Sequence, residues 1–203
     1  MKKFMLMVVA AMMATVSVKA QTAGEMYIKP MVGATASTIV GKDVKDAKMR
    51  IGFVGGAEFG YQISNPFALT AGVVVAMQGA NYKDSQFFKD QKVKFTYLNV
   101  PILANFYVTR GLAIKAGIQP GFLLSVKETG SEYYENAWDS YEDTSMDAMK
   151  KFDLSIPVGL SYEFSDFVID ARYNIGVTNI SKLDLAKPRN SVIMLTVGYK
   201  IPF

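Results

Sequence analysis

The sequence contains no cysteine and no histidine among its 203 residues. Without cysteine the chain can form no disulfide, no thiolate metal site and no lipoprotein anchor. Without histidine it lacks the commonest general base, so a catalytic site would need an Asp–Ser or Asp–Asp pair near the rim. We therefore expect a non-enzymatic protein with no catalytic, metal or cofactor site.

Long hydrophobic runs are also missing from most of the chain. Half of the residues are hydrophobic and 20% are charged, which excludes a disordered protein because enough apolar surface is present to offset the ordering entropy. After Gln21, however, no uncharged apolar run reaches the roughly 20 residues that a membrane-spanning helix needs. If the mature chain spans a membrane, it must do so as a closed barrel.

The first twenty residues, Met1–Ala20, have the pattern of a cleavable secretory signal peptide. Lys2 and Lys3 precede an apolar stretch, and small residues stand before the expected cleavage after Ala20. Removing this segment with its three lysines leaves 19 of the 22 basic residues against 18 acidic ones. A net charge of +1 gives no support for a nucleic-acid partner.

Eight segments of the remaining chain alternate between apolar and polar residues, as strands with two different faces do. In the clearest one, every second residue from Phe152 to Phe164 is apolar and the residues between are polar or small. The predicted strands are Met26–Thr35, Ile51–Gln62, Phe67–Gln78, Lys94–Val108, Leu112–Ser125, Phe152–Phe164, Phe167–Thr178 and Ile193–Phe203.

The predicted connections alternate strictly between short and long. The short turns are Ser64–Pro66, Thr109–Gly111 and Ser165–Asp166, and the long links are Ala36–Arg50, Gly79–Val93, Glu128–Lys151 and Asn179–Asn190. Outer-membrane barrels have short periplasmic turns and longer extracellular loops. Residues 21–203 are therefore expected to form an all-β, eight-stranded, antiparallel, up-and-down transmembrane β-barrel with periplasmic termini and four extracellular loops.

Alternation alone does not say which face points outward. A soluble, lipocalin-like periplasmic binding barrel would turn the apolar face inward, whereas a membrane barrel turns it toward lipid. Glycines crowd the polar face, which suits the cramped interior of a small barrel better than a solvated sheet surface. Aromatic residues gather beside the short turns, as in a membrane-interface girdle, at Phe59, Tyr61, Phe67, Phe106, Tyr162, Phe164, Phe167, Tyr199 and Phe203. We expect the apolar face to contact outer-membrane lipid.

The polar face carries charges of both signs, which we expect to neutralise one another in the lumen. The basic residues are Lys29, Lys115, Arg172 and Lys200, and the acidic ones are Glu58, Asp153, Glu163 and Asp170. An eight-stranded barrel is just wide enough to be filled by side chains, so the prediction is a plugged lumen with a hydrogen-bonded ion network. A narrow channel or porin that conducts ions or protons is the alternative.

The link Glu128–Lys151 concentrates surface chemistry, because acidic residues alternate there with the aromatic residues Tyr133, Tyr134, Trp138 and Tyr141. The favoured interpretation is a mobile, solvated loop that its charge keeps soluble. The alternative is a surface that contacts an extracellular protein, a glycan or a cation. The carboxylate spacing does not match a calcium loop, which needs repeated Asp or Asn ligands around a central glycine.

Three stretches together resemble the PorT-like outer-membrane β-barrel family, which is common in Bacteroidetes. They are YLNVPILANFY at Tyr97–Tyr107, AGIQPGFLLS at Ala116–Ser125, and Phe152–Ile180 with the closing strand to Phe203. The resemblance implies an outer-membrane location, a barrel of about eight strands of the OmpA/OmpX kind, and no known catalytic site. It also implies that Phe203 serves as a signal to the barrel-assembly machinery. The namesake takes part in protein secretion linked to gliding, a role that nothing in this chain singles out.

Overall fold

The computed structural model describes residues 22–42, 44, 47–84, 88–134, 137–182 and 187–203. The signal peptide predicted over Met1–Ala20 lies outside these residues. Within them the secondary structure consists of antiparallel strands joined into one sheet. No helix in this part of the chain is long and apolar enough to cross a membrane.

The described residues contain twelve strand segments, more than the eight predicted. They are β1 (Met26–Val40), β2 (Ala47–Lys48), β3 (Arg50–Ser64), β4 (Phe67–Tyr82), β5 (Phe88–Asn99), β6 (Ile102–Tyr107), β7 (Leu112–Tyr134), β8 (Ala137–Asp143), β9 (Phe152–Phe164), β10 (Phe167–Gly176), β11 (Arg189–Tyr199) and β12 (Ile201–Pro202).

The additional segments arise from two interruptions and two short strands outside the ring. β5 and β6 both pair with β4 and β7 and are separated at Val100–Pro101, because proline has no N–H to give to the ladder. β11 and β12 both pair with β1 and are separated at Lys200. β2 pairs with β4 and β8 pairs with β7. The predicted antiparallel barrel class is confirmed.

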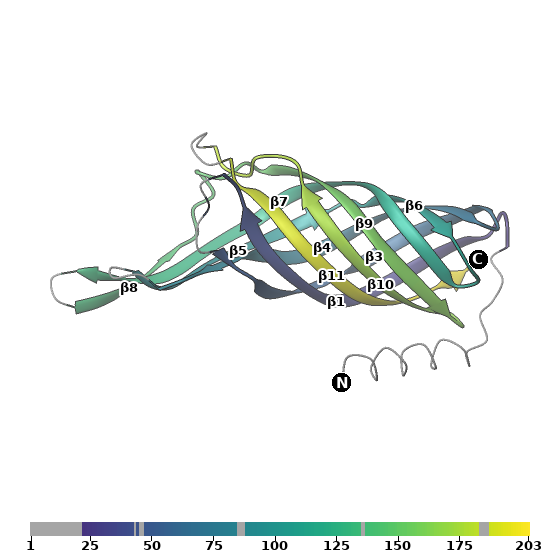
Figure 1. The fold of residues 1–203 in the computed structure, drawn as a ribbon, viewed down its shortest axis with the longest axis horizontal. Coiled ribbons are helices and arrows are strands. Elements are labelled where there is room, and N and C mark those ends of the chain that lie inside the picture. Colours follow the sequence, from purple (N-terminus) through teal and green to yellow (C-terminus); the bar gives the residue numbers. More distant parts are fainter. Residues whose placement is uncertain (1–21, 43, 45–46, 85–87, 135–136, 183–186) are drawn as a thin grey trace.

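The sheet closes on itself because β1 pairs with β3 on one side and with β11 on the other. Its strands wind obliquely around the barrel in Figure 1. The short turns and the C-terminus share one end, where the Lys200 N–H donates to Asp166 O at 2.7 Å. We call this the turn end. The opposite end, toward which β8 projects in Figure 1, is the loop end.

The two faces of the strands have opposite environments. Phe53 is 73% exposed and Val32 is 69% exposed, whereas Glu58 and Asp170 are each 1% exposed. In this part of the barrel apolar side chains thus cover the outside and charged side chains lie inside, the reverse of a soluble protein. The lipocalin-like alternative, with its apolar face inward, is wrong for this reason.

One glycine shows why the lumen needs small residues. Tyr27 and Gly60 face each other across β1 and β3, and the Tyr27 ring occupies the space above the glycine. A Cβ atom at position 60 would overlap that ring. Gly60 therefore allows a buried tyrosine to cross the narrow interior.

The strands extend further toward the loop end than predicted. The expected link Glu128–Lys151 is not a loop throughout, since β7 continues to Tyr134 and turns back as β8. The expected link Gly79–Val93 is likewise taken up largely by the ends of β4 and β5. The prediction of a loop at Glu128–Lys151 was based on its acidic residues. These residues stand between tyrosine, tryptophan and threonine residues, which favour strands. We call the extension formed by β8 and the facing parts of β5 and β7 the outer ribbon (Figure 1).

Candidate functional site

The middle of the lumen holds five charged side chains that form one connected cluster, which we call the central ion group. β1, β3, β7 and β10 supply its members, because each strand turns every second residue inward. All five side chains are at most 5% exposed. The members are Lys29, Glu58, Lys115, Asp170 and Arg172.

Two carboxylates share three cations in this group. Glu58 lies 2.7 Å from Lys29 Nζ and 2.6 Å from Arg172 Nη2. Asp170 accepts from Lys115 Nζ at 2.6 Å, and from Arg172 Nε at 2.6 Å and Nη2 at 2.8 Å. Such short, charge-assisted bonds hold long side chains in one arrangement. The group carries one excess positive charge, so it is not neutral by itself.

A second charged cluster lies nearer the turn end. Lys200 Nζ is 3.6 Å from a Glu163 oxygen and 3.5 Å from a Glu25 oxygen. The Tyr107 hydroxyl donates to Glu163 at 2.5 Å, and Lys200 lies 4.2 Å from the centre of the Tyr27 ring. This cluster has one excess negative charge, which opposes the excess of the central ion group.

Asp153 lies apart from the other predicted network members. Its carboxylate accepts from the Thr178 hydroxyl at 2.5 Å and from Asn190 Nδ2 at 2.8 Å. The eight charged residues of the predicted network therefore divide into three places instead of forming one. Sequence spacing could place all eight on the inner face, but it could not give their heights along the barrel.

Buried apolar clusters lie on both sides of the central ion group. Toward the turn end, Ala68, Tyr107 and Ala113 form a small cluster on the adjoining strands β4, β6 and β7. Toward the loop end is a cluster of Met31, Val54, Val74, Ala76 and Met194. Close packing of these side chains limits access of water to the charges beside them.

The loop end of the lumen is apolar, whereas the sequence predicted a polar inner face of charged and small residues. Its buried cluster comprises Ile39, Ala80, Val93, Phe95, Tyr97, Leu123, Val126 and Ile180. The signal was present at the start of the fourth predicted strand and in the link residue before it, where Val93, Phe95 and Tyr97 alternate with lysine and threonine. Around the middle of the barrel the outer surface is apolar, and we call this part the membrane band. Where a strand extends past it toward the loop end, its outer surface becomes polar and its apolar residues face inward.

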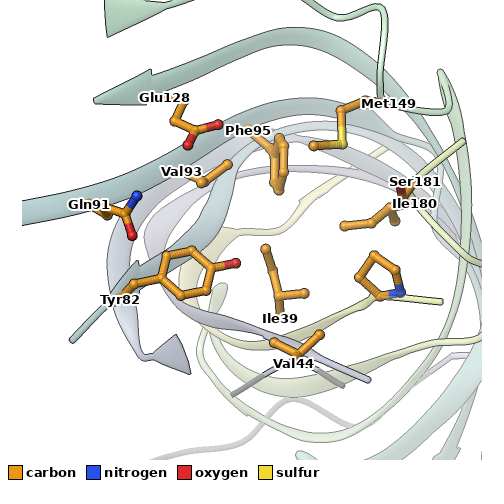
Figure 2. Close-up of a pocket in the computed structure, with 11 residues that line it drawn as sticks. Ile39, Val44, Tyr82, Gln91, Val93, Phe95, Glu128, Met149, Ile180 and Ser181 are labelled. Atoms are coloured by element: carbon orange, nitrogen blue, oxygen red, sulfur yellow. The ribbon is translucent and has the colours of Figure 1, made fainter. Parts of the chain in front are cut away.

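A cavity of about 330 Å³ opens beside this cluster, and we call it the mouth pocket. Figure 2 shows the side chains of Ile39, Phe95 and Met149 directed into it, and the Tyr82 hydroxyl pointing toward its centre. Burial raises the pKa of Tyr82, with a smaller contribution from the Glu128 carboxylate. The lining residues are Ile39, Val44, Tyr82, Gln91, Val93, Phe95, Glu128, Met149, Ile180, Ser181 and Pro188.

Two long connections support the far wall of the mouth pocket by pairing with each other. The backbone N–H of Lys150 donates to Ile180 O at 2.8 Å, and that of Lys182 donates to Ala148 O at 2.9 Å. Met149 and Ser181 form a β-bridge between these hydrogen bonds. The wall is thus held by backbone hydrogen bonds as well as by side-chain packing.

The outer ribbon carries three of the predicted contact residues in described positions. Tyr133 and Trp138 face each other across β7 and β8 with ring centres 5.2 Å apart, and both side chains are 40% exposed. Lys89 Nζ lies 4.0 Å from the centre of the Trp138 ring. Nearer the barrel, Tyr141 accepts from Gln91 at 3.1 Å. The side chain of Tyr134 lies outside the described part of the structure.

Two remaining predictions concern metals and the C-terminal aromatic residue. Among the described residues no cluster of three or more Asp or Glu side chains could hold a metal ion. Phe203 is 73% exposed at the turn end and its ring centre lies 6.0 Å from that of Phe59. Its role as an assembly signal stays a prediction.

Comparison with known proteins finds a matching family and several solved barrels of similar fold. The model of a family described as "Outer membrane protein beta-barrel domain" matches residues 19–182. Ail, the attachment invasion locus protein of Yersinia pestis, solved in complex with the heparin analogue sucrose octasulfate, is 22% identical with a TM-score of 0.51, and the match covers 89% of this chain and 100% of Ail. OprG from Pseudomonas aeruginosa is 16% identical with a TM-score of 0.45, over 91% and 99% of the two chains. A comparison with curated proteins finds no match.

Proposed function

We propose a function from one premise: the chain belongs to the outer membrane protein β-barrel domain family, whose model matches it over residues 19–182. It is accordingly an outer-membrane β-barrel protein in contact with membrane lipid. The proposal is that residues 21–203 form a non-enzymatic barrel with a plugged, charged lumen, exported by the signal peptide Met1–Ala20. Its outer ribbon contacts a protein or glycan partner outside the cell. Membership of the narrower PorT-like group stays a prediction.

The orientation in the membrane forms part of this proposal. The short turns and the C-terminus lie at one end, and the long connections with the outer ribbon lie at the other. Short turns face the periplasm in barrels of this type. The termini are therefore proposed to be periplasmic and the ribbon extracellular.

The packing of the lumen supports a closed barrel in preference to a narrow channel. The central ion group joins four strands across the interior, and buried apolar clusters lie on both sides of it. A permeating ion would have to separate carboxylate–cation pairs 2.6–2.7 Å apart. Breaking such buried pairs is strongly unfavourable.

The observation that carries partner contact is the aromatic tip of the outer ribbon. Tyr133 and Trp138 present half-exposed rings at the end of a paired hairpin, and Lys89 lies over the indole. Aromatic rings beside a cation bind flat apolar surfaces and polar groups together, as at many protein and carbohydrate interfaces. Backbone pairing from Glu128 to Tyr134 presents this tip as a structured surface. Ail was solved with a heparin analogue, so sulfated glycans are one class to test.

Trp138 supplies a built-in reporter, because it is the only tryptophan in the chain. The full protein in lipid nanodiscs is titrated with sucrose octasulfate and, separately, with a neutral chitooligosaccharide. Contact with either probe is expected to shift or quench the Trp138 emission, and Tyr133→Ala is expected to weaken the response at least about tenfold. Glu132→Ala, on the same hairpin, serves as the control.

A protein partner is tested on intact cells that carry Tyr133→Ala or the Glu132→Ala control. Loss of surface attachment with Tyr133→Ala alone supports the proposal. Unchanged emission with both glycans together with unchanged attachment would contradict it. Planar-bilayer recording tests the lumen separately: the wild-type protein is expected to give no stable open conductance, and a well-resolved conductance would favour the narrow-channel alternative.

A further inference from the structure

We propose that the mouth pocket binds a small cationic amphiphile, namely an ammonium group carried on an apolar body of about a dozen non-hydrogen atoms. The site is separate from the tip of the outer ribbon, so this inference does not depend on the ribbon contacting a partner. It rests on the size of the pocket, on the charge of its described lining and on the way the Glu128 carboxylate is held.

The size of the pocket sets the size of the body. Its volume of about 330 Å³ falls at the lower end of the range for small-molecule sites, roughly 300–1,000 Å³. A cavity of about 150 Å³ accommodates benzene, so a space about twice as large fits a ring with a short chain. A larger lipid or a folded protein segment would not fit inside it.

The lining determines the character of the body. Ile39, Phe95 and Ile180 belong to the buried cluster at the loop end, so they form a wall that exists before any ligand arrives. Val44, Met149 and Pro188 complete the apolar surface. Transfer of an apolar ring from water onto such a wall is favourable, and the thioether of Met149 can adapt to its outline.

The charge of the lining determines the head group. Among its described lining residues Glu128 is the only charged one, and no described lysine or arginine contributes. A carboxylate at the edge of an apolar space favours a cation and opposes an anion, because the low local dielectric strengthens both effects. The Tyr82 hydroxyl, which points into the pocket, can accept a hydrogen bond from the same ammonium group.

Glu128 is positioned by its neighbours and keeps the capacity to bind a ligand. The Tyr141 hydroxyl donates to Glu128 Oε1 at 3.3 Å and itself accepts from Gln91 Nε2 at 3.1 Å. An ionised carboxylate has about four acceptor positions, of which Tyr141 uses one. This chain of two hydrogen bonds aims the carboxylate at the rim of the pocket, where Figure 2 places it.

The test uses the full protein in lipid nanodiscs and three probes with the same phenylbutyl body. They are 4-phenylbutylamine, which is cationic, 4-phenylbutanol, which is neutral, and 4-phenylbutyrate, which is anionic. Titration calorimetry against empty nanodiscs removes the contribution of partitioning into lipid. The amine is expected to bind saturably and at least about tenfold tighter than the alcohol, with the anion weakest, because only the amine forms an ion pair with the Glu128 carboxylate.

Glu128→Gln is expected to remove the preference of the amine over the alcohol while leaving alcohol binding within about twofold. Glu132→Gln, four residues further along the same strand, is the matched control and should leave the preference intact. Ile39→Trp, which fills the pocket, should weaken amine and alcohol alike. Heat-modifiable migration on unboiled gels checks that each variant is folded. Equal binding of amine and alcohol to the wild type, an unchanged preference in Glu128→Gln, or no saturable binding would each overturn the proposal.

Discussion

The same strands build two regions with opposite polarity. In the membrane band, β11 turns Leu195 and Val197 outward and Thr196 inward. Near the loop end, β5 turns Lys92 outward and buries Val93 and Phe95. The band has a polar inside and an apolar outside, and the outer region has the reverse. The backbone pattern is identical, so the difference follows from the surrounding solvent, hydrocarbon in one case and water in the other.

The two regions also differ in what stabilises their folded structure. In the band, lipid accepts the apolar face, and the interior holds ion pairs, small residues and two apolar clusters. In the outer region, water drives Ile39, Phe95 and Ile180 together as in an ordinary soluble core. Substitutions that are harmless in one region should therefore be severe in the other.

The largest effect is expected from breaking the central ion group. Asp170→Leu removes a carboxylate that lies 2.6 Å from both Lys115 and Arg172, so Lys115 stays buried without this partner and Arg172 keeps only Glu58. The free energy of unfolding should fall by about 3–5 kcal/mol, measured by urea unfolding in detergent micelles. Glu142→Leu, which removes an exposed ion pair with Lys127 in the outer ribbon, should lower it by less than about 1 kcal/mol. Similar losses in both variants would remove the distinction between the regions.

A slightly smaller effect is expected in the outer apolar cluster. Phe95→Ala deletes a side chain that is 1% exposed and should lower the free energy of unfolding by about 3 kcal/mol, since it leaves a cavity. Phe53→Ala makes the same chemical change on the lipid face, where Phe53 is 73% exposed. Lipid chains fill the vacated space there, so the loss should be less than half as large. The comparison fails if the lipid-face variant is the more damaging one.

The third largest effect is expected from a charge placed on the outer surface, which should destabilise the membrane band but not the outer ribbon. Leu195→Arg puts a guanidinium into the apolar band and should lower the free energy of unfolding in lipid by about 2–3 kcal/mol. Ser140→Arg puts it on the exposed surface of the outer ribbon, where the change should stay within about 0.5 kcal/mol. If Leu195→Arg proved as mild as Ser140→Arg, position 195 would face water.

The smallest effect is expected at the tip of the outer ribbon. Tyr133→Ala removes a ring pair with Trp138 and should weaken the local pairing of β7 with β8 by about 1 kcal/mol. Hydrogen exchange of the β8 amides should therefore quicken, while the urea midpoint of the whole barrel stays unchanged. A shifted global midpoint would mean that the ribbon and the barrel unfold as one unit.

The sequence predicted the barrel class and the inward charges because a period of two needs only local information. Lys29, Glu58, Lys115, Asp170 and Arg172 were assigned to the inner face, and all five are buried there. Their division from Lys200, Glu163 and Asp153 depends on strand stagger, which pairs Lys29 with Glu58 and Arg172 with Gly159. That stagger follows from closure of the sheet and is not written in any single segment.

The prediction went wrong where strands leave the membrane. The acidic residues of Glu128–Lys151 were interpreted as marking a solvated loop, yet Tyr133 pairs with Trp138 in a hairpin. For the same reason the mouth pocket was missed, since Val93 and Phe95 sit among lysines in a segment assigned to a connection and a strand start. Charge on one face identifies contact with water, which suits an exposed ribbon as well as a loop.

The absence of native cysteine allows a direct measurement of the central claim, that the apolar face meets hydrocarbon. A fluorophore is attached to Leu195→Cys or to Ser140→Cys in the full protein, which is reconstituted into vesicles containing lipids with a quencher in the acyl chain. Strong quenching at position 195 with none at position 140 is the predicted result. Absence of quenching at position 195, with the protein remaining in aqueous solution without detergent, would contradict the account.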